Sequence, residues 1–275
     1  MLIMRKIMRR KDKSAAALAL LTLLCLTAAC GRSSASVVVA GSTSVQPYAE
    51  ILAEEFAAVQ PGSQVDVQGG GSAAGITAAE SGIADIGMSS RDLTDDENSQ
   101  LWSVEIAKDG IALVVNPANP VSGLTLDQVR DIYDQAVTSW SQAGGRNAPI
   151  DVITREDGSG TRSSFESMVM GGEQITPRAI VQDSNGAVRQ VVADDPNAIG
   201  FISLGLVDDT VKSVTLDGVE PTDANVVNGT YSLYRPFLFL AKTEPTGEAK
   251  QFVDFVLSPA GQQVLVKEGL IPAND

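Results

Sequence analysis

The chain of 275 residues contains no histidine and only two cysteines, and its 34 acidic residues outnumber its 20 basic ones. Without histidine it cannot carry a Ser-His-Asp triad, a histidine-ligated zinc ion or histidine acid–base chemistry. The acidic balance also opposes binding to nucleic acid or to an anionic lipid surface.

The first 30 residues have the order of a secretory signal. Six basic residues precede an apolar run at 15–29, which is too short to span a bilayer comfortably. The segment ends in LTAACG, which resembles a bacterial lipoprotein signal with Cys30 as the lipidated residue. We therefore predict a signal peptide over 1–30, a flexible tether over 31–36 and a lipid on Cys30. An ordinary cleaved signal with a chance cysteine is the alternative.

Removal of that signal changes the balance of charge and leaves no thiol. Cys25 lies inside the signal, so the mature chain would have no disulfide and no cysteine for catalysis or metal binding. Six of the 20 basic residues and one of the 34 acidic residues lie in 1–30, which leaves 14 bases against 33 acids, a net charge of −19. An anion site on such a protein must rely on local donors, because the global field is repulsive.

Three strand–loop–helix units open the mature chain. The predicted strands lie at 36–40, 64–68 and 83–88, and each is followed by a loop that contains serine. The predicted helices lie at 47–61, at 73–80 and after a capping box formed by Thr94 and Glu97. Three such crossings indicate a parallel α/β sheet, in which ligands bind at the carboxyl ends of the strands.

A second α/β region follows a strand predicted at 110–117. Its first helix begins at a capping box of Thr125 and Gln128. Further strands are predicted at 149–153, 179–181 and 198–202, with helices beginning near 163 and 184. A strand at 236–240 would return the chain to the first region, and two helices are predicted within 247–275. Together these elements predict two lobes.

The segment TREDGSGTRSS (154–164) combines two glycines, several hydroxyls and Arg155 between a predicted strand and a predicted helix. The first N–H groups of a helix and the positive end of its dipole favour an anion. Arg155 can add a forked, permanently charged donor, and we expect Asp157 to hold that fork in position. A simple Gly/Ser turn with a surface arginine is the alternative.

Six segments carry a family resemblance, in this order: GSTSVQP, GGGSAAG, DIGMSSRDL, TREDGSGTRSSF, NAIGFISLG and SPAGQQVLVKEGLIP. Together they resemble the phosphate-binding lipoproteins of the high-affinity phosphate ABC importer. The resemblance implies an α/β periplasmic-binding-protein fold of type II. Each lobe would be a mostly parallel sheet flanked by helices, and two crossing strands would join the lobes. The lobes would comprise 37–115 with 236–275, and 116–235.

The resemblance also implies a set of ligand contacts. The phosphate-binding residues would be Thr43, Ser44, Ser72, Arg155, Ser159, Gly160 and Thr161, with Asp157 as the orienting partner of Arg155. One departure concerns the loop after the third strand. Where many members have an aspartate that accepts a proton of the phosphate, this chain has Ser90 followed by Arg91. We include both as candidate contacts. Because the aspartate is missing, the sequence supports the binding of an anion more strongly than selectivity for phosphate.

We therefore predict a monomeric, non-enzymatic receptor without cofactor or metal. It would be anchored by its lipid at the outer face of the cytoplasmic membrane and would deliver inorganic phosphate to an ABC permease. A receptor for sulfate, molybdate or a phosphonate is the alternative within the same class. A secreted metal-dependent phosphatase and a lipid-anchored adhesin are the alternatives from other classes.

Overall fold

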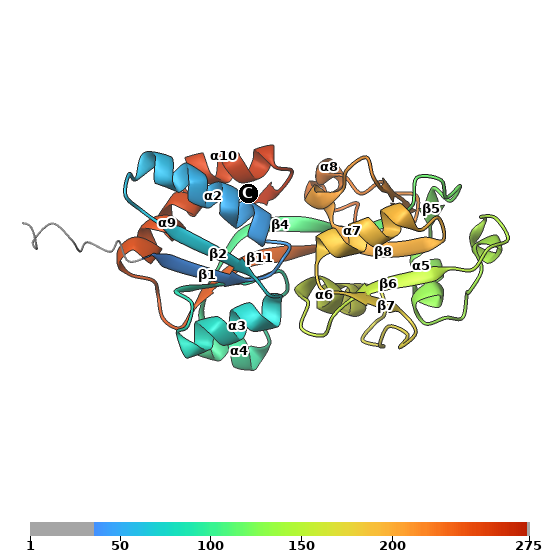
Figure 1. Ribbon diagram of the computed structural model, residues 1–275, viewed down its shortest axis with the longest axis horizontal. Coiled ribbons are helices and arrows are strands. Elements are labelled where there is room, and N and C mark those ends of the chain that lie inside the picture. Colours follow the sequence, from blue (N-terminus) through green and yellow to red (C-terminus); the bar gives the residue numbers. More distant parts are fainter. Residues whose placement is uncertain (1–35, 274–275) are drawn as a thin grey trace, which may run out of the picture. The chain divides into compact units, whose positions relative to one another are not determined.

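The computed structural model describes residues 36–273 (Figure 1). The predicted signal peptide, Cys30 and residues 31–35 of the tether lie outside these described residues. Within 36–273, no helix combines the length and the apolarity that a membrane span requires.

The strands form two parallel groups joined by two longer strands. The sheet order is β2-β1-β3-β11-β4-β8-β6-β7. In the first group, β1 (Val37–Gly41) lies between β2 (Val65–Gly69) and β3 (Ile86–Ser89), parallel to both. In the second, β6 (Asp151–Arg155) is parallel to β7 (Ile180–Gln182) and β8 (Ala198–Ser203). The predicted fold class is thus confirmed.

The joining strands are β4 (Trp102–Val115) and β11 (Tyr234–Ala241), which run antiparallel to each other. Residues 102–110 of β4 pair with β11, whereas residues 111–115 pair with β8. One continuous strand therefore belongs to both lobes. The sequence predicts this strand only from residue 110, because Lys108 and Asp109 interrupt the apolar run that precedes it.

In the first lobe, helices cover both faces of the sheet (Figure 1). On one side lie α2 (Gln46–Val59), α9 (Gly247–Leu257) and α10 (Pro259–Lys267), and on the other lie α3 (Ser72–Ser81) and α4 (Asp95–Gln100). Successive side chains of a strand point to opposite faces. Accordingly, Phe239 packs with Phe252 of α9, whereas Leu240 packs with Ile76 of α3.

The second lobe also has a core on each face of its sheet. The helices α5 (Leu126–Tyr133) and α6 (Gly160–Met168) cover one face, and α7 (Asn185–Asp194) covers the other. The rings of Phe165 and Phe201 stack with centroids 4.2 Å apart, and Tyr133 packs against both. This packing fixes α6, the helix that follows the Arg155 loop, against β8.

Both predicted capping boxes are present, at Thr94 with Glu97 and at Thr125 with Gln128. Helix α6 begins at Gly160, earlier than predicted, because Ser159 caps it by accepting a hydrogen bond from the Arg162 N–H at 3.3 Å. Several short elements escape prediction because they contain too few residues to show a period. They are β5 (Gly123–Leu124), η2 (Trp140–Ala143), η3 (Leu204–Leu206), β9 (Lys212–Ser213), β10 (Thr215–Leu216), α8 (Asp223–Val227) and β12 (Ile271–Pro272).

Candidate functional site

Three serine hydroxyls meet where the parallel strands of the first lobe end. Ser42 follows β1, Ser72 follows β2 and begins α3, and Ser90 follows β3. The Ser42 Oγ donates to the Ser90 Oγ at 2.8 Å, and the Ser90 N–H donates to the Ser72 Oγ at 3.0 Å. All three side chains are buried. Neighbouring parallel strands therefore place hydroxyls in one cluster, as the sequence predicts.

The start of α6 in the second lobe lies directly against this cluster. A Cβ atom added to Gly160 would lie 2.3 Å from the Ser72 Oγ and 2.6 Å from the Ser90 Oγ. A main-chain hydrogen bond, from the Ala73 N–H to the Gly158 carbonyl at 3.0 Å, joins the same two loops. Only a residue without a side chain allows this approach, which brings the first N–H groups of α6 to the hydroxyls.

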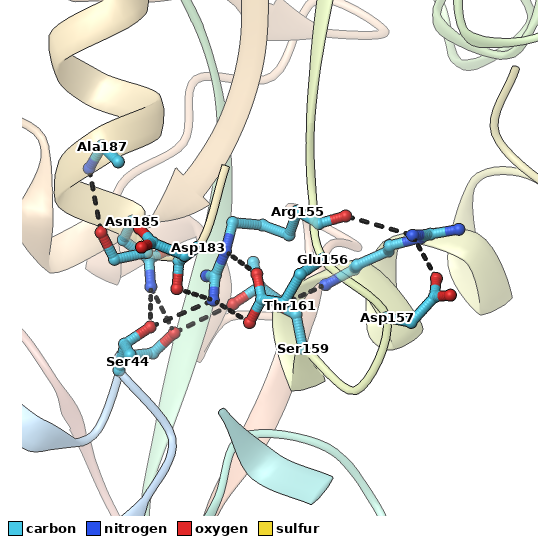
Figure 2. A network of polar contacts seen from close by, with 12 residues as sticks. Ser44, Arg155, Glu156, Asp157, Ser159, Thr161, Asp183, Asn185 and Ala187 are labelled. Carbon is cyan, nitrogen blue, oxygen red and sulfur yellow. Dashed lines mark hydrogen bonds and ion pairs between the residues drawn. The ribbon is translucent and has the colours of Figure 1, made fainter. Parts of the chain in front are cut away.

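Arg155, the last residue of β6, is 1% exposed. Its Nε and Nη2 donate to the two carboxylate oxygens of Glu156 at 2.8 and 2.9 Å, and Nη2 also reaches the Thr43 Oγ1 at 3.2 Å and the Asp183 carbonyl at 3.2 Å (Figure 2). The remaining nitrogen, Nη1, is buried and has no hydrogen-bond partner. Such a donor is rare in proteins and costs free energy unless something accepts from it.

The orienting carboxylate of Arg155 is Glu156, which corrects the prediction that it would be Asp157. The Asp157 side chain is 95% exposed and accepts from the Arg162 Nη1 at 2.5 Å, pointing away from the Arg155 guanidinium (Figure 2). Because β6 ends at Arg155, strand alternation stops there and Glu156 can fold back onto its neighbour.

Asn185, at the first position of α7, also points into the site from the second lobe. Its Nδ2 donates to the Ser44 Oγ at 2.9 Å and to the Thr43 Oγ1 at 3.4 Å, while its Oδ1 accepts from the Ser203 N–H. The Ser44 Oγ also lies 2.9 Å from the Thr161 Oγ1 (Figure 2). Hydrogen bonds thus connect hydroxyls of the two lobes across their seam.

A second buried guanidinium, Arg235 of β11, completes the site. It is 2% exposed, and its Nη2 donates to the Asp109 Oδ2 at 3.0 Å and to the Ser44 Oγ at 3.0 Å. Its Nη1 lies 3.4 Å from the Ser90 Oγ. Burial lowers the pKa of Arg235, and the positive charge of Arg155 lowers it further, while Asp109 opposes both effects. The two arginines are therefore close enough to repel each other.

Sequence reasoning missed Arg235, Asp109 and Asn185. Arg235 and Asp109 each border an apolar run, and nothing in the sequence shows that they lie opposite each other. The only available signal was an ionisable residue inside the extended segments that become β4 and β11. Asn185 has the appearance of an ordinary residue at a helix start, directly after the N-cap Ser184.

Arg91 is held apart from the other candidate residues. Its two terminal nitrogens each donate to a carboxylate oxygen of Glu97 at 2.8 Å. These bonds, with the backbone N–H of Thr94, lower the pKa of Glu97 to about 2. Arg91 lines a groove of about 500 Å³ beside the site, together with Ser159 and Arg235. Its guanidinium is already satisfied by Glu97, so the structure does not bring it together with the hydroxyl cluster.

The fully buried charged side chains of the described residues all lie in this site. Within residues 36–273 the buried charged side chains are Asp109, Arg155 and Arg235, which sum to one positive charge. No group of three or more acidic or cysteine side chains suited to a metal ion occurs in that range. Each of the two arginines is paired with a carboxylate, Arg155 with the partly exposed Glu156 and Arg235 with the buried Asp109, and both pairs lie beside hydroxyls and helix N–H groups.

Two α/β lobes that enclose a donor-rich site at their seam define a bilobal binding protein. Comparison with known proteins agrees, since the model of the PBP superfamily domain matches residues 27–260. The phosphate-binding protein PstS of Bacillus subtilis is 32% identical over 249 residues, which cover 89% of this chain and 83% of that protein. The chain belongs to the PBP superfamily and, within it, to the family of the PstS phosphate-binding proteins.

Solved structures show the same relationship. A Clostridium perfringens protein assigned as a phosphate ABC transporter substrate-binding protein, with bound phosphate, has a TM-score of 0.83 and 45% identity. An ABC-type phosphate transport receptor from Vibrio cholerae has a TM-score of 0.72 and 41% identity. Each alignment covers 86% of this chain and 99% of the other.

Proposed function

We propose that this protein is an extracytoplasmic receptor that captures inorganic phosphate between its lobes and delivers it to an ABC permease. The observation that carries the proposal is the buried, unpartnered Nη1 of Arg155 beside a cluster of hydroxyls from both lobes. A phosphate oxygen is the acceptor that this donor lacks. The relatives named for phosphate binding support the same ligand.

The physical basis is a balance between desolvation and hydrogen bonding. A hydrogen bond to a charged group contributes about 1.5–3 kcal/mol, so several together offset the cost of removing a small anion from water. The anion would also reduce the repulsion between Arg155 and Arg235, which adds to the larger effect of burial in lowering the pKa of Arg235. Local donors therefore overcome the repulsive net charge of the whole protein.

The proposed contacts are the predicted ones with two changes. They comprise Thr43, Ser44, Ser72, Ser90, Arg155, Ser159, Gly160 and Thr161, with Glu156 in place of Asp157 as the orienting carboxylate and without Arg91. The lobes, with the boundaries given above, would open and close by bending in β4 and β11, the strands that they share. The relatives are binding proteins, so the ligand would be released unchanged.

We also propose where the receptor is located in the cell. A lipid on Cys30 would tether the monomeric receptor to the outer face of the cytoplasmic membrane, within reach of the permease. The sequence LTAACG and the basic head before it support this placement. Labelling of expressed protein with a radioactive fatty acid would test it, since Cys30→Ala should abolish the label.

Calorimetric titration with phosphate tests the receptor function directly. We expect saturable binding of one phosphate per chain. At a phosphate concentration of 100 times the dissociation constant, the free energy of unfolding should rise by about 2.7 kcal/mol. Sulfate, arsenate and molybdate complete the panel. If none of these oxyanions binds or raises the melting temperature, the proposal is wrong.

A further inference from the structure

Carboxylates hold Arg155 and Arg235 in the same way. The Nε and Nη2 of Arg155 donate to the two carboxylate oxygens of Glu156 at 2.8 and 2.9 Å. The Nε and Nη2 of Arg235 donate to the Asp109 Oδ2 at 3.3 and 3.0 Å. The same edge of each guanidinium is therefore used, and Nη1 lies outside the ion pair. The Arg155 Nη1 has no hydrogen-bond partner among residues 36–273, which makes the Arg235 Nη1 a second candidate donor to a ligand.

The Nη1 of Arg235 has no well-formed hydrogen bond within the described chain. Its one acceptor there is the Ser90 Oγ at 3.4 Å, whereas an N–H donor and its oxygen acceptor usually lie about 2.7–3.2 Å apart. The same oxygen already accepts from the Ser42 hydroxyl at 2.8 Å. Nη1 carries two hydrogens, so one is weakly bonded and the other has no partner among these residues. Because the Arg235 side chain is only 1% exposed, these donors call for a further acceptor.

The Arg235 guanidinium ends beside groups that are proposed to hold the anion. Its Nη2 donates to the Ser44 Oγ at 3.0 Å, and that oxygen lies 2.9 Å from the Thr161 Oγ1. On the other side, the Ser90 Oγ would lie 2.6 Å from a Cβ atom added to Gly160. One hydroxyl therefore separates Arg235 from Thr161, and one separates it from the start of α6. An anion held by these groups lies within reach of Nη1.

Contacts with its own strand and with the neighbouring strand fix the Arg235 side chain. The guanidinium carbon lies 5.5 Å from the centroid of the Phe237 ring, a distance at which a cation is attracted to the ring face. Asp109 lies directly opposite in the ladder between β11 and β4. A donor that is already ordered loses little conformational entropy when a ligand binds.

We propose that Arg235 is a second arginine contact of the phosphate, with its Nη1 donating directly to an oxygen of the anion. The inference rests on the proposed function and adds a residue to its site. The charge of Arg155 adds to the effect of burial in lowering the pKa of Arg235, so the two guanidinium groups lie near enough for one anion to contact both. The ligand would then contact β11, a strand that joins the lobes, as well as loops of both lobes.

The alternative is that Arg235 only neutralises Asp109. A variant that removes both charges tests this, because it leaves no unpaired charge in the interior. Arg235→Gln combined with Asp109→Asn should weaken phosphate binding about 10- to 100-fold, the effect of losing one hydrogen bond from a charged donor. Titration calorimetry measures the affinity, and urea denaturation checks that the variant is folded. Unchanged affinity in this folded variant would overturn the inference.

A matched control neutralises an ion pair elsewhere in the second lobe. Arg130→Gln combined with Asp127→Asn removes the pair within α5, whose carboxylate is 85% exposed. The affinity for phosphate should stay as in the wild type. An equal loss in the control and in the site variant would show a general effect of charge and would overturn the direct contact.

A second comparison separates direct contact from an effect through the hydroxyls. In the background Ser44→Ala with Ser90→Ala, the hydroxyls that Arg235 touches are absent. The loss caused by Arg235→Gln with Asp109→Asn should persist in this background, because the lost bond is made to phosphate. Phosphorus NMR titration extends the measurement to weak binding. If the loss disappears with the hydroxyls, Arg235 acts only through them and the proposal is wrong.

Arg235→Lys provides a test that retains a charge for Asp109. Its single nitrogen cannot pair with Asp109 and also take the place of Nη1, so phosphate affinity should fall about tenfold. Wild-type affinity in this variant would contradict the contact. The two proposals fail differently: a wild-type protein that binds no oxyanion overturns the proposed function, whereas phosphate binding that is indifferent to Arg235 overturns only this inference.

Discussion

Arg235 and Asp109 lie directly opposite each other in the ladder between β11 and β4, and the Arg235 Nη2 donates to the Asp109 Oδ2 at 3.0 Å. Both side chains are almost fully buried. Burial raises the pKa of the Asp109 carboxyl, and Arg235 with the Ser203 hydroxyl opposes that rise. The pair places a charge in each of the two strands that join the lobes, next to the proposed phosphate site.

We expect Asp109→Asn to destabilise the protein, because it leaves a buried guanidinium without its counter-ion. Loss of one partner of a buried ion pair costs about 3–5 kcal/mol. Urea denaturation measures the change. Asp127→Asn removes an ion pair whose carboxylate is 85% exposed, and should cost less than about 1 kcal/mol. Equal costs for the two substitutions would contradict this account.

Arg155→Ala should weaken phosphate binding by about 2–5 kcal/mol, the range for a buried charge pair that loses one member. Calorimetry at low ionic strength measures the affinity. Arg130→Ala, which removes a guanidinium of α5 that pairs with Asp127, is the control and should leave the affinity unchanged. Unaltered binding by Arg155→Ala would remove the central residue from the site.

The choice between Glu156 and Asp157 as partner of Arg155 can be tested with two isosteric variants. Glu156→Gln keeps the shape but removes the charge that holds the guanidinium, and should weaken phosphate binding by about 1–3 kcal/mol. Asp157→Asn affects only the ion pair with Arg162, in which the carboxylate is 95% exposed, and should change the affinity by less than about 0.5 kcal/mol. A larger loss of affinity for Asp157→Asn than for Glu156→Gln would restore Asp157 as the partner of Arg155, the assignment made from the sequence.

Gly160→Ala should abolish high-affinity binding, since its Cβ would lie 2.3 Å from the Ser72 Oγ and would separate the two loops. Gly186→Ala is the matched control in α7, where an added Cβ meets nothing within 4 Å. That substitution should raise the free energy of unfolding by about 0.5–1 kcal/mol through helix propensity and leave binding intact. Normal phosphate affinity in Gly160→Ala would show that the contact is not part of the site.

The ion pair of Arg91 and Glu97 should make stability sensitive to acid. The Glu97 pKa is lowered from 4.5 to about 2, chiefly by Arg91, so this stabilisation is complete above pH 4.5 and is lost as the pH falls toward 2. With allowance for the partial exposure of both groups, it amounts to about 1–2 kcal/mol. Glu97→Gln keeps the helix cap but removes the charge. The stability difference between Glu97→Gln and the wild type should therefore shrink over that pH interval; a constant difference would contradict the prediction.

Much of the site could be predicted because its loops follow apolar strands directly. Ser72, Ser90 and Gly160 each occur at a strand–helix crossing, and parallel strands bring such crossings to one edge. The fold class could be predicted for the same reason. The pairing of Arg155 with Glu156 instead of Asp157 could not be predicted, because it depends on the exact residue at which β6 ends.

Long-range pairing explains the remaining failures. Arg235 and Asp109 are 126 positions apart, and only the register of β11 against β4 places one beside the other. Asn185 reaches Ser44 over 141 positions, across the seam. Local patterns of hydrophobicity and capping contain no information about such pairs.

The main-chain hydrogen bond from Ala73 to the Gly158 carbonyl separates two tasks that a receptor must perform. Bringing the loops together depends partly on backbone atoms, which no point substitution deletes unless it introduces proline. Recognition of the anion depends on side-chain hydroxyls and on the side-chain nitrogens that donate to them. Substitution of a few side chains could therefore change which anion the protein binds, while the backbone contact that joins the two loops stays in place.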